Sequence, residues 1–229
     1  MKKLSINQDI LKIAALLLMT VDHIGMFFSS SLCAQTCRLI GRASYPLFAY
    51  LLMMNLAKYQ VFDKYLKRLG FFGIITFFMC IPIQFIFKVP VTFNILLGFW
   101  LVVAALCFYH KIEKLKCNKF LQLLLFSPLF ILCAVAAVPF AYNFLGFLFC
   151  FCLYFYFLKK TPEWLISSLL LSYLINFDFC GPIISLLVTT FLLLGIQIKS
   201  KPRLLHHWWF FYVYYPAHIV VLALIAYFL

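Results

Sequence analysis

Charged residues are scarce in this sequence. Only 11% of its 229 residues are charged and only 6 are Asp or Glu, whereas 66% are hydrophobic. Soluble domains have roughly 25% charged and about 45–50% apolar residues, so a soluble monomer could not cover this much apolar surface. A glycine-rich phosphate loop and a Gly-x-Ser-x-Gly turn are also lacking. These features exclude a soluble enzyme and a disordered chain. A nucleic-acid-binding protein is excluded as well, because the 19 Lys and Arg form short runs and no basic face.

Long apolar blocks alternate with short basic segments along the chain. Because one helical crossing needs about 20 apolar residues, this pattern predicts an all-α, polytopic helical integral membrane protein with about nine transmembrane helices in one domain, 1–229. An eight-helix alternative arises because the second and seventh blocks are short and the breaks at Pro139 and at residues 178–182 are tight. The expected helices span residues 10–28, 43–56, 69–87, 91–109, 120–138, 140–158, 164–177, 181–198 and 208–229.

The basic residues predict the orientation of the chain in the membrane. Most Lys and Arg fall on alternate connections, and the other side has only Arg38, Arg42 and Lys88. Cytoplasmic loops carry the excess of Lys and Arg, so we expect a cytoplasmic N-terminus and an external C-terminus. The predicted cytoplasmic segments are the N-terminus and residues 58–68, 111–119, 159–160 and 199–203.

Two adjacent ionisable residues, Asp22 and His23, lie inside the first apolar block. Their position also argues against a cleaved signal peptide, whose apolar region would have to contain or directly precede them. A charged side chain at membrane depth costs about 2.5–3.5 kcal/mol and is functional by default. We therefore expect both residues to have polar partners or water.

The last apolar block contains His218, and Tyr214 and Tyr215 lie on the same helical face. Arg38 and Arg42 precede the second block on the side that basic residues avoid, which indicates an anion for them to bind. We expect the charged residues of the first, second and last helices to converge on one polar cavity, because clustering lets them share partners and water.

Each of these residues also has a purely structural interpretation. His218 could be a neutral, hydrogen-bonded packing residue, and Asp22 with Arg42 could be an ion pair that only joins two helices. Asn94 could hydrogen-bond across helices without a chemical role. His206 and His207, beside two tryptophans, are typical of an interfacial aromatic belt.

Two motifs in this order resemble the TraX family of membrane acetyltransferases, which includes conjugal pilin acetylases and relatives linked to fimbrial assembly. The first is IAALLLMTVDHIG at residues 13–25, similar to the family's apolar first helix ending in Asp-His-Ile-Gly. The second is RLIGRASYPLFAYLL at residues 38–52. Supporting segments are KYLKRL at 64–69, FNILLG at 93–98 and YYPAH at 214–218.

The resemblance implies acetyl transfer from acetyl-CoA, as co-substrate and without a metal, to an amine such as the N-terminus of a pilin or fimbrial subunit. It also implies a multi-pass protein of the bacterial inner membrane. An imidazole with an ordinary pKa of about 6.5 suits proton removal from the attacking amine. We expect His23 to be the base, Asp22 its orienting partner or the partner of Arg42, and His218 a second acid, base or acyl carrier. The residues expected to bind substrate or an anion are Arg38, Arg42, Tyr45, Asn94 and Tyr215.

Two rival functions use the same residues. In a proton-coupled transporter, the Asp, His and Arg side chains would form a relay across the bilayer and no covalent product would appear. In a non-catalytic assembly factor for pili or fimbriae, the charges would only lock helices together. Residue patterns do not distinguish these functions, whereas acetylated product would.

Overall fold

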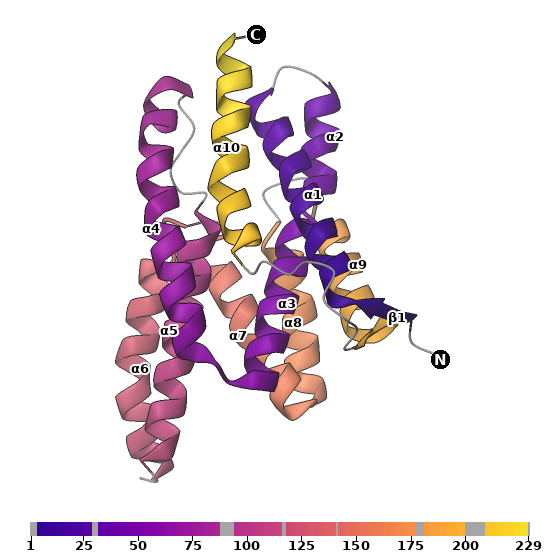
Figure 1. Cartoon of the computed structure of the whole chain (residues 1–229). Coiled ribbons are helices and arrows are strands. Elements are labelled where there is room, and N and C mark those ends of the chain that lie inside the picture. The colour runs from indigo at the N-terminus through magenta and orange to yellow at the C-terminus, as the bar shows by residue number, and fades with distance from the viewer. Residues whose placement is uncertain are drawn as a thin grey trace.

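The computed structural model of the protein describes residues 4–28, 32–87, 94–115, 118–140, 142–176, 181–199 and 209–228. These residues are almost entirely helical (Figure 1), so the predicted all-α class is confirmed. A π-helical turn, η2 (Phe191–Gly195), continues α9. The helices are α1 (Gln8–Phe27), α2 (Leu32–Gly41), α3 (Ser44–Tyr59), α4 (Phe62–Phe87), α5 (Ile95–Lys114), α6 (Lys119–Ala136), α7 (Asn143–Lys159), α8 (Pro162–Leu174), α9 (Pro182–Thr190) and α10 (Phe210–Phe228).

Five of the described helices are long and apolar enough to cross a membrane: α1, α4, α5, α6 and α10. The other predicted crossings fall on α3, α7, α8 and α9, which have 16, 17, 13 and 9 residues. The count of nine transmembrane helices is therefore not confirmed. Local signals explain the shorter lengths: left-handed residues Gln60 and Lys160 end α3 and α7, and a proline begins α8 and α9.

Large apolar side chains are exposed along the outer helices. On α4, Phe71, Phe78 and Phe85 are 61%, 64% and 81% exposed, and they recur every seven residues on one face. The α6 helix exposes Leu124 and Ile131 in the same way. An apolar surface of this extent is stable against lipid and not against water. The helices thus indicate a membrane protein whose outer faces contact the bilayer.

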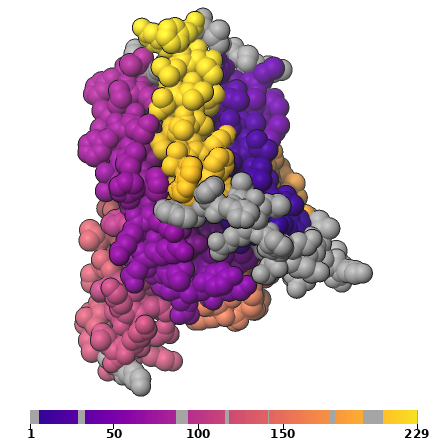
Figure 2. Space-filling view, in the orientation of Figure 1, coloured from indigo at the N-terminus to yellow at the C-terminus, as the bar shows by residue number. Residues whose placement is uncertain are grey.

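The centre of the molecule is built around α3, where Ala49, Met53 and Leu56 are completely buried. This helix packs against α1 and α7, and α5 packs against α4, α6 and α7. The α10 helix lies between α4 and α1, and its outer face is open along its length (Figure 2). This arrangement brings the first and last helices of the chain together.

Buried polar side chains join α8 to α9. Ser172 donates a hydrogen bond to the carbonyl of Ser185 at 2.8 Å, and its hydroxyl lies 2.6 Å from that of Thr189. Asn176 donates to the hydroxyl of Ser185. Hydrogen bonds between small polar residues are a common means of joining helices in lipid, where the hydrophobic effect contributes little. No pattern in the sequence predicted this contact.

A small parallel sheet departs from the expected pattern. Strand β1 (Leu4–Asn7) pairs with β2 (Ile196–Lys199), with Leu4 opposite Ile196. Residues 196–198 were expected at the end of the transmembrane helix 181–198, and this expectation was wrong. The alternation of apolar and polar residues in IQIK has the period of a strand, and it favours an extended conformation after η2.

The connections that carry most of the basic residues lie at one end of the molecule. The α3–α4, α5–α6 and α7–α8 connections are all at the lower end in Figure 1, whereas the C-terminus lies at the upper end. By the positive-inside rule we expect reporter fusions to place residues 58–68 and 111–119 in the cytoplasm and the C-terminus outside it. A cytoplasmic C-terminus would contradict this orientation.

Candidate functional site

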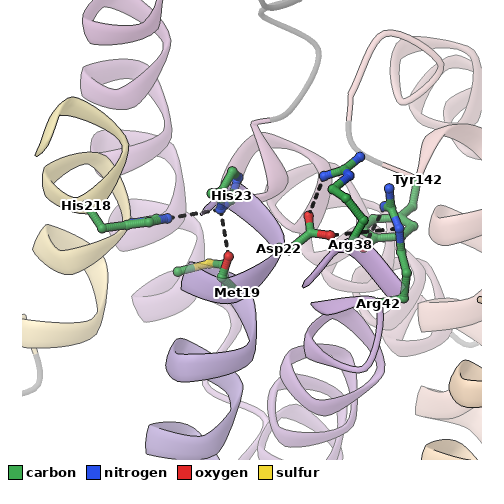
Figure 3. A network of polar contacts seen from close by, with 7 residues as sticks. All are labelled: Met19, Asp22, His23, Arg38, Arg42, Tyr142 and His218. Carbon is green, nitrogen blue, oxygen red and sulfur yellow. Dashed lines mark hydrogen bonds and ion pairs between the residues drawn. The ribbon is translucent and has the colours of Figure 1, made fainter. Parts of the chain in front are cut away.

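Asp22 and His23 are consecutive residues of α1 that face different neighbours (Figure 3). Their side chains project about 100° apart, as adjacent residues of an α-helix must. Asp22 faces Arg38 of α2, whereas His23 faces His218 of α10. Asp22, His23 and His218 are buried, at 8%, 6% and 7% exposure. One turn of α1 therefore supports two polar groups, an imidazole pair and an ion-pair cluster.

Backbone carbonyls determine which nitrogen of each imidazole carries the proton. Nδ1 of His23 lies 2.9 Å from the Met19 carbonyl oxygen, and Nδ1 of His218 lies 2.9 Å from that of Tyr214. A carbonyl oxygen only accepts hydrogen bonds, so both Nδ1 atoms bear hydrogen in the neutral rings. Nε2 of His218, 3.0 Å from Nδ1 of His23, must then be an acceptor. The unprotonated nitrogen of His23 is therefore Nε2.

Two tyrosines hold α10 in position beside this imidazole pair. The hydroxyl of Tyr214 lies 2.7 Å from that of Thr20 on α1. The hydroxyl of Tyr215 accepts a hydrogen bond of 3.3 Å from the backbone N–H of Ile95 at the start of α5. The Tyr215 ring also packs edge-on against His23, with 6.5 Å between the ring centroids. The orientation of His218 is thus tied to both α1 and α5.

The ion-pair cluster joins α1 to the segment that follows it. Nη1 of Arg38 donates to Oδ2 of Asp22 at 2.8 Å, and Nε of Arg42 lies 3.9 Å from Oδ1 of Asp22. Of the two alternatives that the sequence left open for Asp22, orienting His23 or pairing with an arginine, the structure shows the arginine contact. The shorter contact is with Arg38, although the pairing expected from the sequence was with Arg42.

Close packing of α1 against α2 makes this ion pair possible. A Cβ atom at Gly41 would overlap the backbone and Cβ of Asp22, and one at Gly25 would lie 2.5 Å from the Ala34 carbonyl oxygen and 2.9 Å from Cγ of Arg38. Both helices therefore require glycine where they cross. The 2.8 Å contact between Arg38 and Asp22 lies at this crossing.

We expect Gly41→Ala to destabilise the protein by about 1–3 kcal/mol, because the added methyl group would push Asp22 away from its arginines. Gly195→Ala is the matched control, since the atoms nearest to its methyl group belong to the Phe191 side chain, which is partly exposed and can move. Thermal unfolding in detergent measures the difference. Equal melting temperatures for the two variants would show that the crossing tolerates a larger residue.

Tyr142 belongs to the cluster, although the sequence analysis assigned it no role. Its φ of 64° is left-handed, which is unusual for a bulky residue. This conformation places its hydroxyl 3.5 Å from Nη1 of Arg42 and its ring on that of Tyr45, with centroids 3.9 Å apart. A positive φ at a tyrosine leaves no signature in a single sequence.

The remaining predicted residues have different surroundings. The side-chain amide of Asn94 donates to the Gly73 carbonyl at 2.7 Å and accepts from the N–H of Leu97, so it caps α5 and joins it to α4. This contact fits the structural alternative for Asn94 rather than substrate binding. Tyr45 is buried, and its hydroxyl lies 3.4 Å from Sγ of Cys150. His206 and His207 lie outside the described residues.

In the described part of the chain, the predicted residues do not line a single polar cavity but form a cluster of two groups around α1. The imidazole pair lies on one side of the helix and the ion pairs with Tyr142 lie on the other (Figure 3). The cause is the roughly 100° between consecutive helical residues, which prevents Asp22 and His23 from facing one space. Such a cluster offers an unprotonated imidazole nitrogen and, across α1, two cationic groups beside one carboxylate.

Comparisons with known proteins identify the family to which this chain belongs. Over 94 residues it is 35% identical to an uncharacterized protein of Rickettsia prowazekii (strain Madrid E). The aligned residues make up 41% of this chain and 34% of that protein. The match thus spans about a third of the length of that curated relative. No solved structure matches this chain. The family model described as TraX protein matches residues 7–226. Because that match covers nearly the whole chain, the protein belongs to the TraX family, as its motifs at 13–25 and 38–52 predicted.

Proposed function

We propose that this TraX-family protein is an acetyltransferase of the bacterial inner membrane. The donor is acetyl-CoA from the cytoplasm, and the acceptor is an amine, the N-terminus of a pilin or fimbrial subunit. The observation that carries the proposal is the pair of contacts that Nδ1 of the buried His23 makes with Met19 and His218. These contacts leave Nε2 of His23 unprotonated. An amine can attack a thioester only after losing a proton, and a positioned imidazole is suited to accept it.

In the proposed reaction, His23 is the only group that takes up a proton and returns it. The amine nitrogen attacks the thioester carbonyl carbon, a C–N bond forms, and Nε2 of His23 accepts the amine proton. The C–S bond then breaks, and the sulfur leaves with the proton that His23 returns. The products are an acetylated amine and a free thiol. While His23 is protonated, its Nδ1–H bonds to Met19 and His218 stabilise the positive charge.

His218 acts in this scheme as a positioning residue. Both of its nitrogens are engaged, Nδ1 with the Tyr214 carbonyl and Nε2 with His23, so neither is available to carry an acyl group. It fixes the tautomer and the orientation of His23. This role differs from the acid, base or acyl carrier that the sequence led us to expect.

We expect His218→Ala to lower the turnover number about 10- to 100-fold with little change in KM, because a misplaced base slows chemistry more than binding. His218→Gln should recover part of the rate, since its amide oxygen can take the place of the Nε2 acceptor. Steady-state kinetics with acetyl-CoA measure both values. If alanine and glutamine at this position gave the same rate, the positioning role would be wrong.

In the proposal, Arg38, Arg42 and Tyr142 bind the phosphates of acetyl-CoA. They lie across α1 from His23 and do not contact the thioester carbonyl. Guanidinium and phenol groups donate hydrogen bonds to phosphate oxygens, most strongly in a site from which water is excluded. Asp22 holds Arg38 in place through their contact of 2.8 Å.

Transfer to a defined peptide tests the proposal. The purified protein in lipid nanodiscs is mixed with acetyl-CoA and a peptide that has a pilin-like free N-terminus. We expect acetylated peptide and one free thiol for each acetyl group transferred. The control is the same peptide with a blocked N-terminus. Thiol release without acetylated peptide would indicate hydrolysis only. The absence of both products would favour the assembly-factor function.

A further inference from the structure

Arg42 of the functional cluster packs against Gly181, the buried residue directly before α9. A Cβ atom at Gly181 would lie 2.9 Å from Cγ and 3.1 Å from Cβ of Arg42. These two carbons are the first atoms of the arginine side chain, so displacing them would turn the guanidinium in a different direction. The backbone at Gly181 therefore limits the directions that the Arg42 side chain can take.

Buried polar side chains hold the beginning of α9 against α8. The amide of Asn176 donates a hydrogen bond to the Ser185 hydroxyl, and Ser172 donates one to the Ser185 carbonyl. The Ser172 hydroxyl also contacts that of Thr189. We call Ser172, Asn176, Ser185 and Thr189 the α8–α9 network, and each is at most 2% exposed.

The α8–α9 network reaches the packing contact of Arg42 through Asn176. A Cβ atom at Gly181 would lie 4.0 Å from Cβ of Asn176, in ordinary van der Waals contact. A buried polar group that loses its partner in an apolar environment is not compensated by water, so the network favours one arrangement of α8 and α9. The backbone of Gly181 is thus held next to Arg42 by hydrogen bonds that the proposed reaction does not otherwise use.

We propose that the α8–α9 network, acting through Gly181, positions Arg42 to bind the phosphates of the donor. The inference rests on the proposed acetyl transfer and assigns positioning residues to its donor site. The contacts of Arg42 with Asp22 and Tyr142, at 3.9 and 3.5 Å, are long for hydrogen bonds, and packing against Gly181 supplements them. Gly181 and Asn176 touch the arginine or its neighbour and not the donor.

Two donors separate the positioning of Arg42 from general damage to the protein. Acetyl-CoA has phosphates, whereas S-acetyl-pantetheine has the same thioester without them. We expect Gly181→Ala to raise KM for acetyl-CoA about 10-fold, because a displaced guanidinium loses a charge-assisted hydrogen bond to phosphate. The turnover number with acetyl-CoA, and kcat/KM for S-acetyl-pantetheine, should stay near the wild-type values because His23 is unchanged.

Asn176→Ala is a second variant, in case Gly181→Ala does not fold. It removes the hydrogen bond to Ser185 without adding an atom, and KM for acetyl-CoA should again rise while kcat/KM for S-acetyl-pantetheine does not change. Two matched controls should leave both donors unaffected. Gly195→Ala adds the same methyl group at the end of η2, and Ser168→Ala removes a buried hydroxyl that donates to a carbonyl of its own helix, α8.

A double variant tests whether Gly181 acts through Arg42. When Arg42 is already alanine, Gly181→Ala should not raise KM for acetyl-CoA any further, because the effects of residues that act as a unit are not additive. A further increase of the same size overturns the inference alone. So does an unchanged KM, or an equal loss with both donors, in folded Gly181 and Asn176 variants. Absence of transfer from both donors in the wild type overturns the proposed function, and the inference with it.

Discussion

Acetyl transfer is expected to fall at least about 100-fold in His23→Ala, because the change removes the proposed proton acceptor, and positioned acid–base groups contribute about 10²- to 10⁴-fold. The loss should appear in the turnover number. Protein abundance should stay near the wild-type level, since only one side chain at an α1–α10 contact is shortened. Tyr214 and Thr20 continue to join these helices.

His110→Ala is the matched control for this prediction. His110 is a histidine of α5 whose ring contacts Tyr154 and Glu113, apart from the cluster around α1. Acetylated peptide and membrane abundance are measured for both variants. If His23→Ala kept the full rate, the imidazole pair would be structural. If both variants lost activity together with abundance, the loss would reflect folding and not chemistry.

Asp22→Asn should destabilise the protein by about 3 kcal/mol, because it leaves two guanidinium groups beside a neutral amide. This value is at the low end for a broken buried pair, since the Arg38 side chain retains 19% exposure. Catalysis by the folded fraction should fall less than in His23→Ala, because Asp22 contacts the arginines and not the imidazole.

Asp63→Asn is the control for the lost charge, since Asp63 is an exposed acidic residue in the first turn of α4. Thermal unfolding in detergent and membrane abundance report the stability of both variants. A melting temperature for Asp22→Asn equal to that of Asp63→Asn would show that the α1–α2 ion pair contributes little to folding.

The sequence alone identified most of the cluster. Asp22, His23 and His218 are ionisable residues inside apolar blocks, and such residues are too costly in lipid to lack partners. The apolar blocks themselves predicted helices because their length and composition suit a bilayer. These inferences depend on the free-energy cost of burying a charge or exposing apolar surface to water. The positions of charged and apolar residues in the sequence are enough to recognise that cost.

The partners of these residues could not be predicted from the sequence. Arg38 and Arg42 are four residues apart, and the choice between them depends on the close crossing of α1 and α2 that Gly25 and Gly41 allow. Likewise, the place of Tyr142 beside Arg42 depends on its left-handed backbone. Helix crossings and unusual backbone angles arise from tertiary packing, which periodicity and composition do not encode.

The intact mass of the candidate acceptor subunits tests the central claim most directly. Pilin or fimbrial subunits are purified from cells that contain the wild-type protein, lack it, or contain His23→Ala at equal abundance. We predict that subunits from the wild-type cells are heavier by one acetyl group, located on the N-terminal amine, and that the other two samples are unmodified. Identical masses in all three samples, with assembly still dependent on this protein, would contradict acetyl transfer and leave it a role in assembly alone.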